Sequence, residues 1–139
     1  DEDYLVPIGK ADVKREGKDV TVVGVARNAM LALEAAKILE KEGIDIEVVD
    51  PRTISPLDRK TITESVKKTS RLVIAHDAWK AGGIGAEIAA SVAESVMDYL
   101  DAPIRRVASL DIPAPSTPTL DQHALPNVDK IIKAVKEIV

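Results

Sequence analysis

The chain has no cysteine and very few aromatic residues, with one Trp, two Tyr and no Phe among 139 residues. The absence of cysteine excludes disulfide frameworks, thiol nucleophiles and Cys-ligated zinc. It is typical of the cytoplasm of a prokaryote or of an equivalent reducing compartment. Without Phe, the core must consist of Val, Ile, Leu and Ala, and no platform for stacking nucleobases is expected.

An excess of positive charge is also missing, because Lys and Arg number 19 against 23 Asp and Glu, a net charge of −4. Basic residues gather only at Lys14, Arg15 and Lys18, so we expect no nucleic-acid partner. No run approaches the roughly 18 apolar residues of a membrane span, so we expect no membrane partner either. Asn and Gln are scarce beside Lys, Glu and Ile, a bias typical of a thermostable protein, natural or redesigned.

The length corresponds to one domain, since domains commonly have about 100 to 200 residues. We expect a single domain over residues 1–139, with residues 1–6 as a residual linker. The first residues contain no initiator Met, no basic segment and no apolar stretch, so no secretory signal is expected. The missing Met suggests that the chain was cut from a longer one.

Apolar runs that alternate with helical patterns predict an α/β fold. The runs are almost continuous, as in strands that are buried on both faces of a parallel sheet, except that Arg105 and Arg106 interrupt the last one and indicate an outer strand. Ser55 is expected to cap the second helix, with Pro56 at its first position. The predicted strands cover residues 20–26, 44–50, 71–76 and 104–109. The predicted helices cover 29–42, 55–68, the segment from the glycine-rich turn at 82–85 to about Leu100, and the segment after Asn127.

This order of elements predicts right-handed crossovers and a three-layer α/β/α sandwich with a mostly parallel sheet. Residues 9–13 are expected to fold back antiparallel onto the strand at 20–26. Four prolines between Asp111 and Pro126 argue against regular structure there, and so long a loop favours a docking surface. Ligands of such sheets gather at the carboxyl ends of the strands, in the loops that begin at Ala26, Asp50, His76 and Ser109.

Two of these loops carry candidate anion-binding residues. Arg52 follows the second core strand, and its planar guanidinium is suited to clamp a carboxylate or phosphate. The alternative is a contact with Asp50 or the loop backbone that only orders the turn. The segment with Lys80, Gly82, Gly83 and Gly85 resembles an anion cradle at a helix N-terminus. The alternative there is a tight turn whose glycines allow another domain to pack closely.

His76 and Asp77 are the only candidates for acid–base chemistry. Neighbours on a strand point to opposite faces, so these two side chains need not interact, and a structural histidine is the alternative. No recognisable nucleophile motif occurs, and the other histidine, His123, lies at no metal-ligand spacing. The sequence therefore assigns no catalytic, cofactor-binding or metal-binding residue.

Short motifs in order along the whole chain also resemble those of a known family. They are Val6-Pro7-Ile8-Gly9-Lys10-Ala11, Arg15-Glu16-Gly17-Lys18-Asp19-Val20-Thr21, Ala32-Leu33-Glu34-Ala35-Ala36, Asp50-Pro51-Arg52-Thr53-Ile54-Ser55-Pro56-Leu57-Asp58, Lys68-Thr69-Ser70-Arg71-Leu72, Gly82-Gly83 with Glu87-Ile88, Tyr99-Leu100-Asp101-Ala102-Pro103-Ile104-Arg105-Arg106-Val107, and Leu125-Pro126. This series resembles the C-terminal domain of the β subunit of thiamine-diphosphate-dependent 2-oxo acid dehydrogenase E1 components. Those belong to the pyruvate, branched-chain and acetoin types.

The resemblance implies a transketolase-C-type fold, a five-stranded mixed sheet with one antiparallel edge strand between helices. It implies that thiamine diphosphate and Mg belong to the parent enzyme, between a domain of the α subunit and the N-terminal domain of the β subunit, and that this chain holds neither. The implied partners are the E1 α subunit, a second β subunit and the peripheral subunit-binding domain of E2. The isolated domain is also expected to self-associate.

The resemblance thus implies an assembly and docking domain without decarboxylase activity of its own. Asp111 and the terminal carboxylate of Val139 are candidates for holding a basic partner. Two departures concern such contacts: Pro51 stands where the family usually has leucine, and residues 114–118 lack the usual aromatic. The alternatives are a free-standing domain that binds a small anion with Arg52, Lys80 and the turn at residues 82–85, and a redesigned domain without a cellular role.

Overall fold

A five-stranded mixed sheet with helices on both faces forms the body of the computed structural model, which describes residues 4–114 and 116–139. The linker expected over residues 1–6 therefore lies partly outside the described residues. The strands are β1 (Asp12–Arg15), β2 (Val20–Gly24), β3 (Ile46–Asp50), β4 (Leu72–Trp79) and β5 (Arg105–Ser109). The helices are α1 (Arg27–Lys41), α2 (Arg59–Thr69), α3 (Ile84–Val96), α4 (Pro118–Ala124) and α5 (Val128–Lys136), with a 3-10 turn at Met97–Tyr99.

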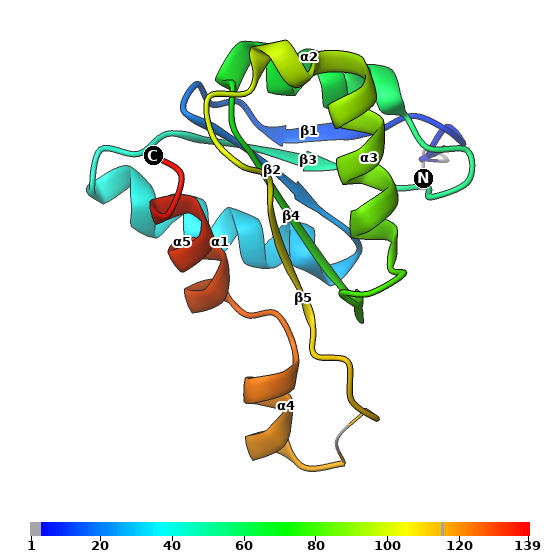
Figure 1. Cartoon of the computed structure of the whole chain (residues 1–139), viewed down its shortest axis with the longest axis vertical. Helices are drawn as coiled ribbons and strands as arrows, with labels where there is room; N and C mark the ends of the chain where they lie inside the picture. Colours follow the sequence, from blue (N-terminus) through cyan, green and yellow to red (C-terminus); the bar gives the residue numbers. More distant parts are fainter. Residues whose placement is uncertain (1–3, 115) are drawn as a thin grey trace.

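The strand order is β1-β3-β2-β4-β5, with β1 antiparallel and the others parallel. As Figure 1 shows, α1 and α5 cover one face, α2 and α3 cover the other, and α4 projects from one end. The core is split accordingly: Val22 packs in the cluster of α1 and α5, while Val23 packs in that of α2 and α3. The predicted α/β sandwich, including an outer position for β5, is confirmed.

The antiparallel partner of β1 differs from the expectation. We expected residues 9–13 to pair with β2, but β1 pairs with β3, with Asp12 opposite Asp50. The reason is that β2, buried along its whole length, already has a parallel neighbour on each side. The edge of β3 that faces away from β2 is free, and the polar sequence of β1 suits such an edge, where Lys14 contacts Asp12 at 2.8 Å and Asp50 at 3.9 Å.

Two further expectations about helices were wrong. The N-cap of α2 is Asp58, not Ser55. The Asp58 carboxylate accepts the Thr61 N–H at 3.1 Å and the Ala11 N–H at 3.0 Å, so it caps the helix and anchors the N-terminal segment together. The proline-rich stretch contains α4, whose Pro118 occupies the first helical turn, where no N–H is needed.

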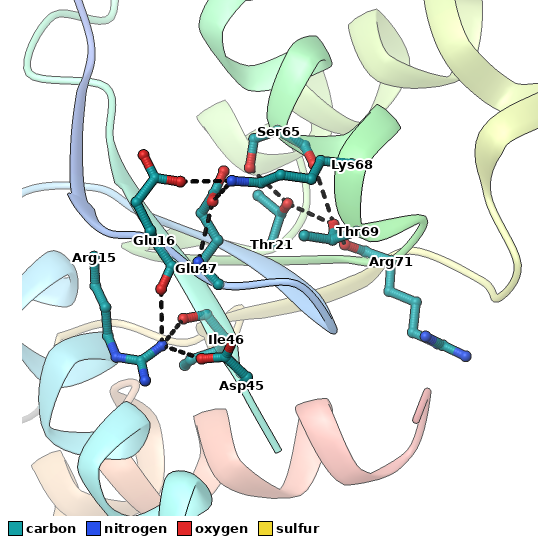
Figure 2. A network of polar contacts seen from close by, with 11 residues as sticks. Arg15, Glu16, Thr21, Asp45, Ile46, Glu47, Ser65, Lys68, Thr69 and Arg71 are labelled. Atoms are coloured by element: carbon teal, nitrogen blue, oxygen red, sulfur yellow. Dashed lines mark hydrogen bonds and ion pairs between the residues drawn. The ribbon is translucent and has the colours of Figure 1, made fainter. Parts of the chain in front are cut away.

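An ion pair between a half-exposed lysine and a buried glutamate joins the β1–β2 turn, β3 and α2 (Figure 2). Glu47 on β3 is only 2% exposed, and its carboxylate contacts the Lys68 ammonium of α2 and accepts the Gly17 N–H at 3.2 Å. Lys68 also donates to Glu16 at 2.6 Å. Hydrogen bonds to Glu16 and Glu47 hold the pKa of Lys68 above its usual range. The charge of Glu47 is thus compensated inside the fold.

The buried hydroxyl of Thr21 on β2 is satisfied in the same region. It lies 2.7 Å from both the Ser65 and the Thr69 hydroxyls of α2. The apolar central strand therefore carries one polar side chain that fixes where α2 sits on the sheet. None of the helices in the described part of the chain is both long and apolar enough to span a bilayer.

We expect Lys68→Met to lower the free energy of unfolding by about 2 kcal/mol. The loss stays below the roughly 3–5 kcal/mol of fully buried pairs because the Lys68 side chain is partly solvated. Its cause is the carboxylate of Glu47, which remains buried without its cation. Urea unfolding of the variant measures the change.

Lys67→Met is the matched control, since Lys67 contacts exposed Glu64 on the same helix and the exposed Tyr99 ring, 5.7 Å from its centroid, so that its removal leaves no buried charge. It should cost no more than about 0.5 kcal/mol. If Lys68→Met and Lys67→Met lowered the free energy of unfolding equally, the pair of Lys68 with Glu47 would contribute no more than an exposed pair.

Candidate functional site

The carboxyl ends of β2, β4 and β5 meet at Asp77. Its carboxylate accepts two hydrogen bonds from the Arg27 guanidinium, both 2.9 Å, and one from the Asn28 side-chain amide at 3.1 Å. Its backbone carbonyl accepts the Ser109 hydroxyl at 2.6 Å. Arg27 also donates to the carbonyl of Pro126 at 3.3 Å, which attaches the segment between α4 and α5. Asp77 thus lies where four segments meet: its carboxylate binds the start of α1, its backbone carbonyl binds the end of β5, and Arg27 links it to the segment at Pro126.

A strained turn places Arg27 at this point. Ala26, between β2 and α1, has φ 55° and ψ −127°, a conformation that side chains other than glycine seldom adopt. Such strain costs on the order of 1–3 kcal/mol and persists only where the surroundings enforce it. Here the contacts of Arg27 and Asn28 with Asp77 hold the start of α1 in place.

His76 lies on the opposite face of β4 from Asp77, as the strand geometry requires. Its side chain is 1% exposed, and neither ring nitrogen has a hydrogen-bond partner in the described part of the chain. Burial, reinforced by the charge of Arg106 and opposed by Asp77, lowers the pKa of His76 below its ordinary value. The imidazole is therefore a neutral core group, separated from the solvent that would carry a substrate.

The glycines after β4 provide room for this imidazole. A Cβ on Gly85 would lie 2.3 Å from the Nε2 of His76, and one on Gly83 would lie 2.2 Å from the carbonyl oxygen of Trp79. Both contacts are far shorter than real Cβ contacts, so only glycine fits. The close approach that the glycines permit is made within this domain, by α3 against β4.

The candidate anion cradle is partly occupied by the chain's own groups. Gly82 has φ +70°, and the N–H of the preceding Ala81 donates to the Asp111 carboxylate at 3.3 Å. A hollow of about 340 Å³ lies beside it. Asp77 lines that hollow, and its negative charge opposes an anion there. Lys80 instead lines a neighbouring cleft along β5.

Arg52 lies apart from these residues. It follows β3, which β2 separates from β4 in the sheet. Its guanidinium donates to Asp12 and to the Tyr4 hydroxyl, both at 3.0 Å, and its backbone N–H donates to Asp50 at 2.9 Å. The structure thus collects Lys80, Gly82, Gly83 and Gly85 on one connection and leaves Arg52 in another.

The two candidate partner residues are accessible. Asp111 follows β5 and is exposed, and Val139 is 51% exposed at the end of the chain beyond α5. Sequence reasoning missed Arg27 and Asn28, although both directly follow the loop that begins at Ala26. Among the residues that the structure describes, no three His, Asp or Glu side chains gather in a way that could hold a metal ion.

We expect the free energy of unfolding to fall as the pH drops below about 6.5, because His76 is neutral in the fold and takes up a proton on unfolding. A depressed folded pKa in a histidine makes the unfolded state the stronger proton binder, so stability rises with pH. One such group contributes at most about 1.4 kcal/mol per pH unit. Urea unfolding between pH 7.5 and 5.5 measures the slope.

His76→Gln should reduce that slope, and His123→Gln, at an exposed position on α4, is the matched substitution for comparison. If the unsubstituted chain and the His76→Gln variant showed the same dependence of unfolding free energy on pH, His76 would not be the group that titrates.

Comparison with known proteins identifies the family. Residues 9–131 match the family model described as "Transketolase, C-terminal domain". The chain is 50% identical over 138 residues to the pyruvate dehydrogenase E1 component subunit beta, mitochondrial, of Dictyostelium discoideum. It is 48% identical over 133 residues to the pyruvate dehydrogenase E1 component subunit beta of Rickettsia felis.

These matches cover 99% and 96% of this chain but only 39% and 41% of the two relatives, so the chain spans about two fifths of their length. Among solved structures, a split gene transketolase described as an inactive beta4 tetramer matches with a TM-score of 0.88 and 33% identity. That match covers 99% of this chain and 45% of the other. The chain therefore belongs to the transketolase C-terminal domain family, as a domain of the kind found in the β subunits of pyruvate dehydrogenase E1.

Proposed function

We propose that this chain is the assembly and docking domain of a 2-oxo acid dehydrogenase E1 β subunit. Its partners in this role are an E1 α subunit, a second β subunit and the peripheral subunit-binding domain of E2. The observation that carries the proposal is the 50% identity to an E1 β subunit over nearly the whole chain. Oxidative decarboxylation then belongs to the complete enzyme.

The chemistry of the described residues agrees with a role without catalysis by the domain alone. His76 is buried and neutral, Asp77 is engaged by Arg27 and Asn28, and Arg52 is engaged by Asp12. No metal-binding group occurs among the described residues, so they do not fit a site for Mg and the diphosphate of thiamine diphosphate. We place both in the remainder of the parent enzyme.

Exposed apolar side chains support an assembly role. Trp79 is 56% exposed, and its indole N–H donates to the carbonyl of Ile112, itself 45% exposed. Leu110 and Leu120 lie exposed on the segment that follows, and Leu5 and Ile8 are exposed near the start of the chain. Exposed apolar groups of this kind mark surfaces that bind other proteins, and the isolated domain should self-associate through them.

The alternative, a small anion at the Gly82–Gly85 turn, is not supported by any specific contact. Asp111 already accepts the Ala81 N–H, and Asp77 lines the hollow. We therefore propose no second function for this turn.

A chimera tests the proposal. The matching segment of the Rickettsia felis β subunit is replaced by this chain, and the chimera is co-expressed with the α subunit of the same organism. We expect the chimera to co-purify with α and to decarboxylate pyruvate when thiamine diphosphate and Mg are added, because the replaced segment supplies the contacts between subunits.

The isolated chain should give no turnover under the same conditions, and the relative's β subunit without this segment should not assemble. Measurable decarboxylation by the isolated chain would contradict the proposal. So would a chimera that unfolds cooperatively, and is therefore folded, yet does not bind α.

Docking to E2 is tested at the two candidate carboxylates in the chimera. Adding Gly-Ser-Gly after Val139, which moves the terminal carboxylate, should weaken binding to the E2 peripheral subunit-binding domain by roughly tenfold at low salt. Asp111→Asn should weaken it less, because Asp111 shares its cleft with Lys80 and Arg106, which repel a basic partner. Calorimetric titration at two salt concentrations measures both effects.

Asp98→Asn, at an exposed carboxylate of the 3-10 turn, is the control and should change nothing. Unchanged affinity in the extended chimera and in Asp111→Asn would rule out docking through these carboxylates.

A further inference from the structure

A cleft of about 630 Å³ runs along the outer edge of the sheet, between β5 and α5. We call it the β5–α5 cleft. One wall contains every residue from Ile104 to Asp111, so the cleft follows the whole length of the edge strand and continues past its end. The remaining lining residues are Lys80, His123, Lys130, Lys133, Ala134 and Glu137.

The lining is strongly cationic in a chain whose net charge is −4. It contains five Lys and Arg side chains but only two carboxylates, and both carboxylates are engaged. Glu137 pairs with Arg105 at 3.1 Å, and Asp111 accepts the Ala81 N–H. The cationic side chains that pair with no carboxylate in the described part of the chain are Lys80, Arg106, Lys130 and Lys133.

Two of these cations already have roles in the fold, and two remain available. Lys130 donates to the carbonyls of His123 and Leu125, at 2.6 and 2.7 Å, and thereby fixes α4 to α5. Arg106 donates one of its N–H groups to the carbonyl of Lys80 at 2.8 Å. The ammonium groups of Lys80 and Lys133 make no hydrogen bond within the described residues, so they are free to meet a ligand.

The cleft also exposes the backbone of an edge strand. β5 is hydrogen-bonded to β4 on one side only, and it is last in the strand order. Its five residues span about 17 Å, enough for five residues of an added strand. At the carboxyl end, the N–H of Leu110 donates to the carbonyl of Ala124, so the chain closes the cleft there.

We propose that the β5–α5 cleft binds an extended acidic segment of a partner protein, which adds to β5 as a sixth strand. Backbone hydrogen bonds to β5 hold the segment, and its carboxylates meet Lys80, Arg106 and Lys133. Because the cations are distributed along the strand and onto α5 instead of converging on one point, the cleft suits a chain of carboxylates better than a single small anion.

The same charges disfavour the other occupants. A second copy of this chain would bring an equally cationic β5 edge against the first, and like charges across an edge prevent pairing. A nucleic acid strand would find no Trp, Tyr or Phe side chain in the lining on which to stack. A basic segment would be repelled by the four cations that lack a carboxylate partner.

The test uses the full chain and a defined probe, an eight-residue peptide with blocked ends that alternates Glu with Val or Thr. Binding is followed by calorimetry and by the amide NMR signals of Arg105–Ser109. We expect saturable binding that weakens several-fold between 50 and 500 mM salt, with slowed amide exchange confined to β5. The same peptide with Lys in place of Glu should not bind.

Lys133→Glu should weaken the binding of the acidic peptide by roughly tenfold, and Lys37→Glu should leave it unchanged. Lys37 is the matched control because it is an exposed lysine on α1 outside the cleft. A peptide N-methylated at every residue should also lose binding, since it has no N–H group left to donate to a strand.

Three results would overturn the proposal. Absence of binding at millimolar peptide would mean that the cations only protect the edge against self-pairing. Equal peptide affinity of the Lys133→Glu and Lys37→Glu variants would show that the peptide binds outside the β5–α5 cleft. Equal binding of the N-methylated peptide would rule out strand addition.

Discussion

The Asp77 carboxylate fixes one end of the molecule, and the arrangement of that end depends on it. An exposed ion pair by itself stabilises a fold by about 1 kcal/mol or less. The contact between Arg27 and Asp77 does more because it is bidentate and shared: Asn28 donates to the same carboxylate, and Arg27 also holds the carbonyl of Pro126. The β2–α1 turn, the end of β4 and the entry to α5 are therefore positioned by one group, and the strain at Ala26 is offset there.

Its neighbour along the strand, His76, organises the other face in a different way. It makes no hydrogen bond within the described residues and acts by shape, since α3 approaches β4 closely enough that Gly83 and Gly85 leave no space for a Cβ. At the carboxyl edge of the sheet, where open α/β sheets usually bind ligands, Asp77 and His76 are thus both engaged by contacts within the chain.

The sequence predicted the fold class because the strongest signals are local. A run such as Val20–Ala26 favours a strand buried on both faces, and the helix expected after Asn127 is present as α5, where Asn127 accepts the Lys130 N–H at 2.9 Å. The errors concern choices between competing partners. The pairing of β1 depends on which strand edge remains free, and the cap of α2 depends on a carboxylate, Asp58, that also anchors a distant segment.

The candidate site was less predictable, for a related reason. Arg27 and Asp77 are separated by 50 positions, and nothing in the local sequence of either residue points to the other. The candidates at Lys80 and Gly82–Gly85 were found because they are consecutive, yet their meaning depends on His76 of β4 and on Asp111 after β5, which contact this connection. Contacts between residues far apart in sequence determine whether a loop is a ligand site or a packing contact.

The distribution of charge over the domain likewise depends on which segments the fold brings together. The net charge of −4 correctly describes the average surface, but it hides the β5–α5 cleft, whose cations come from the end of β4, from β5 and from α5. Arg105 and Arg106 make β5 an outer strand, because charged side chains cannot be buried on both faces of a sheet without partners. With β5 outermost, α5 brings Lys130 and Lys133 beside it. The arginines that place β5 at the edge of the sheet therefore also contribute to the positive charge of that edge. The acidic remainder of the surface and this basic edge can therefore select partners of opposite charge on a single domain.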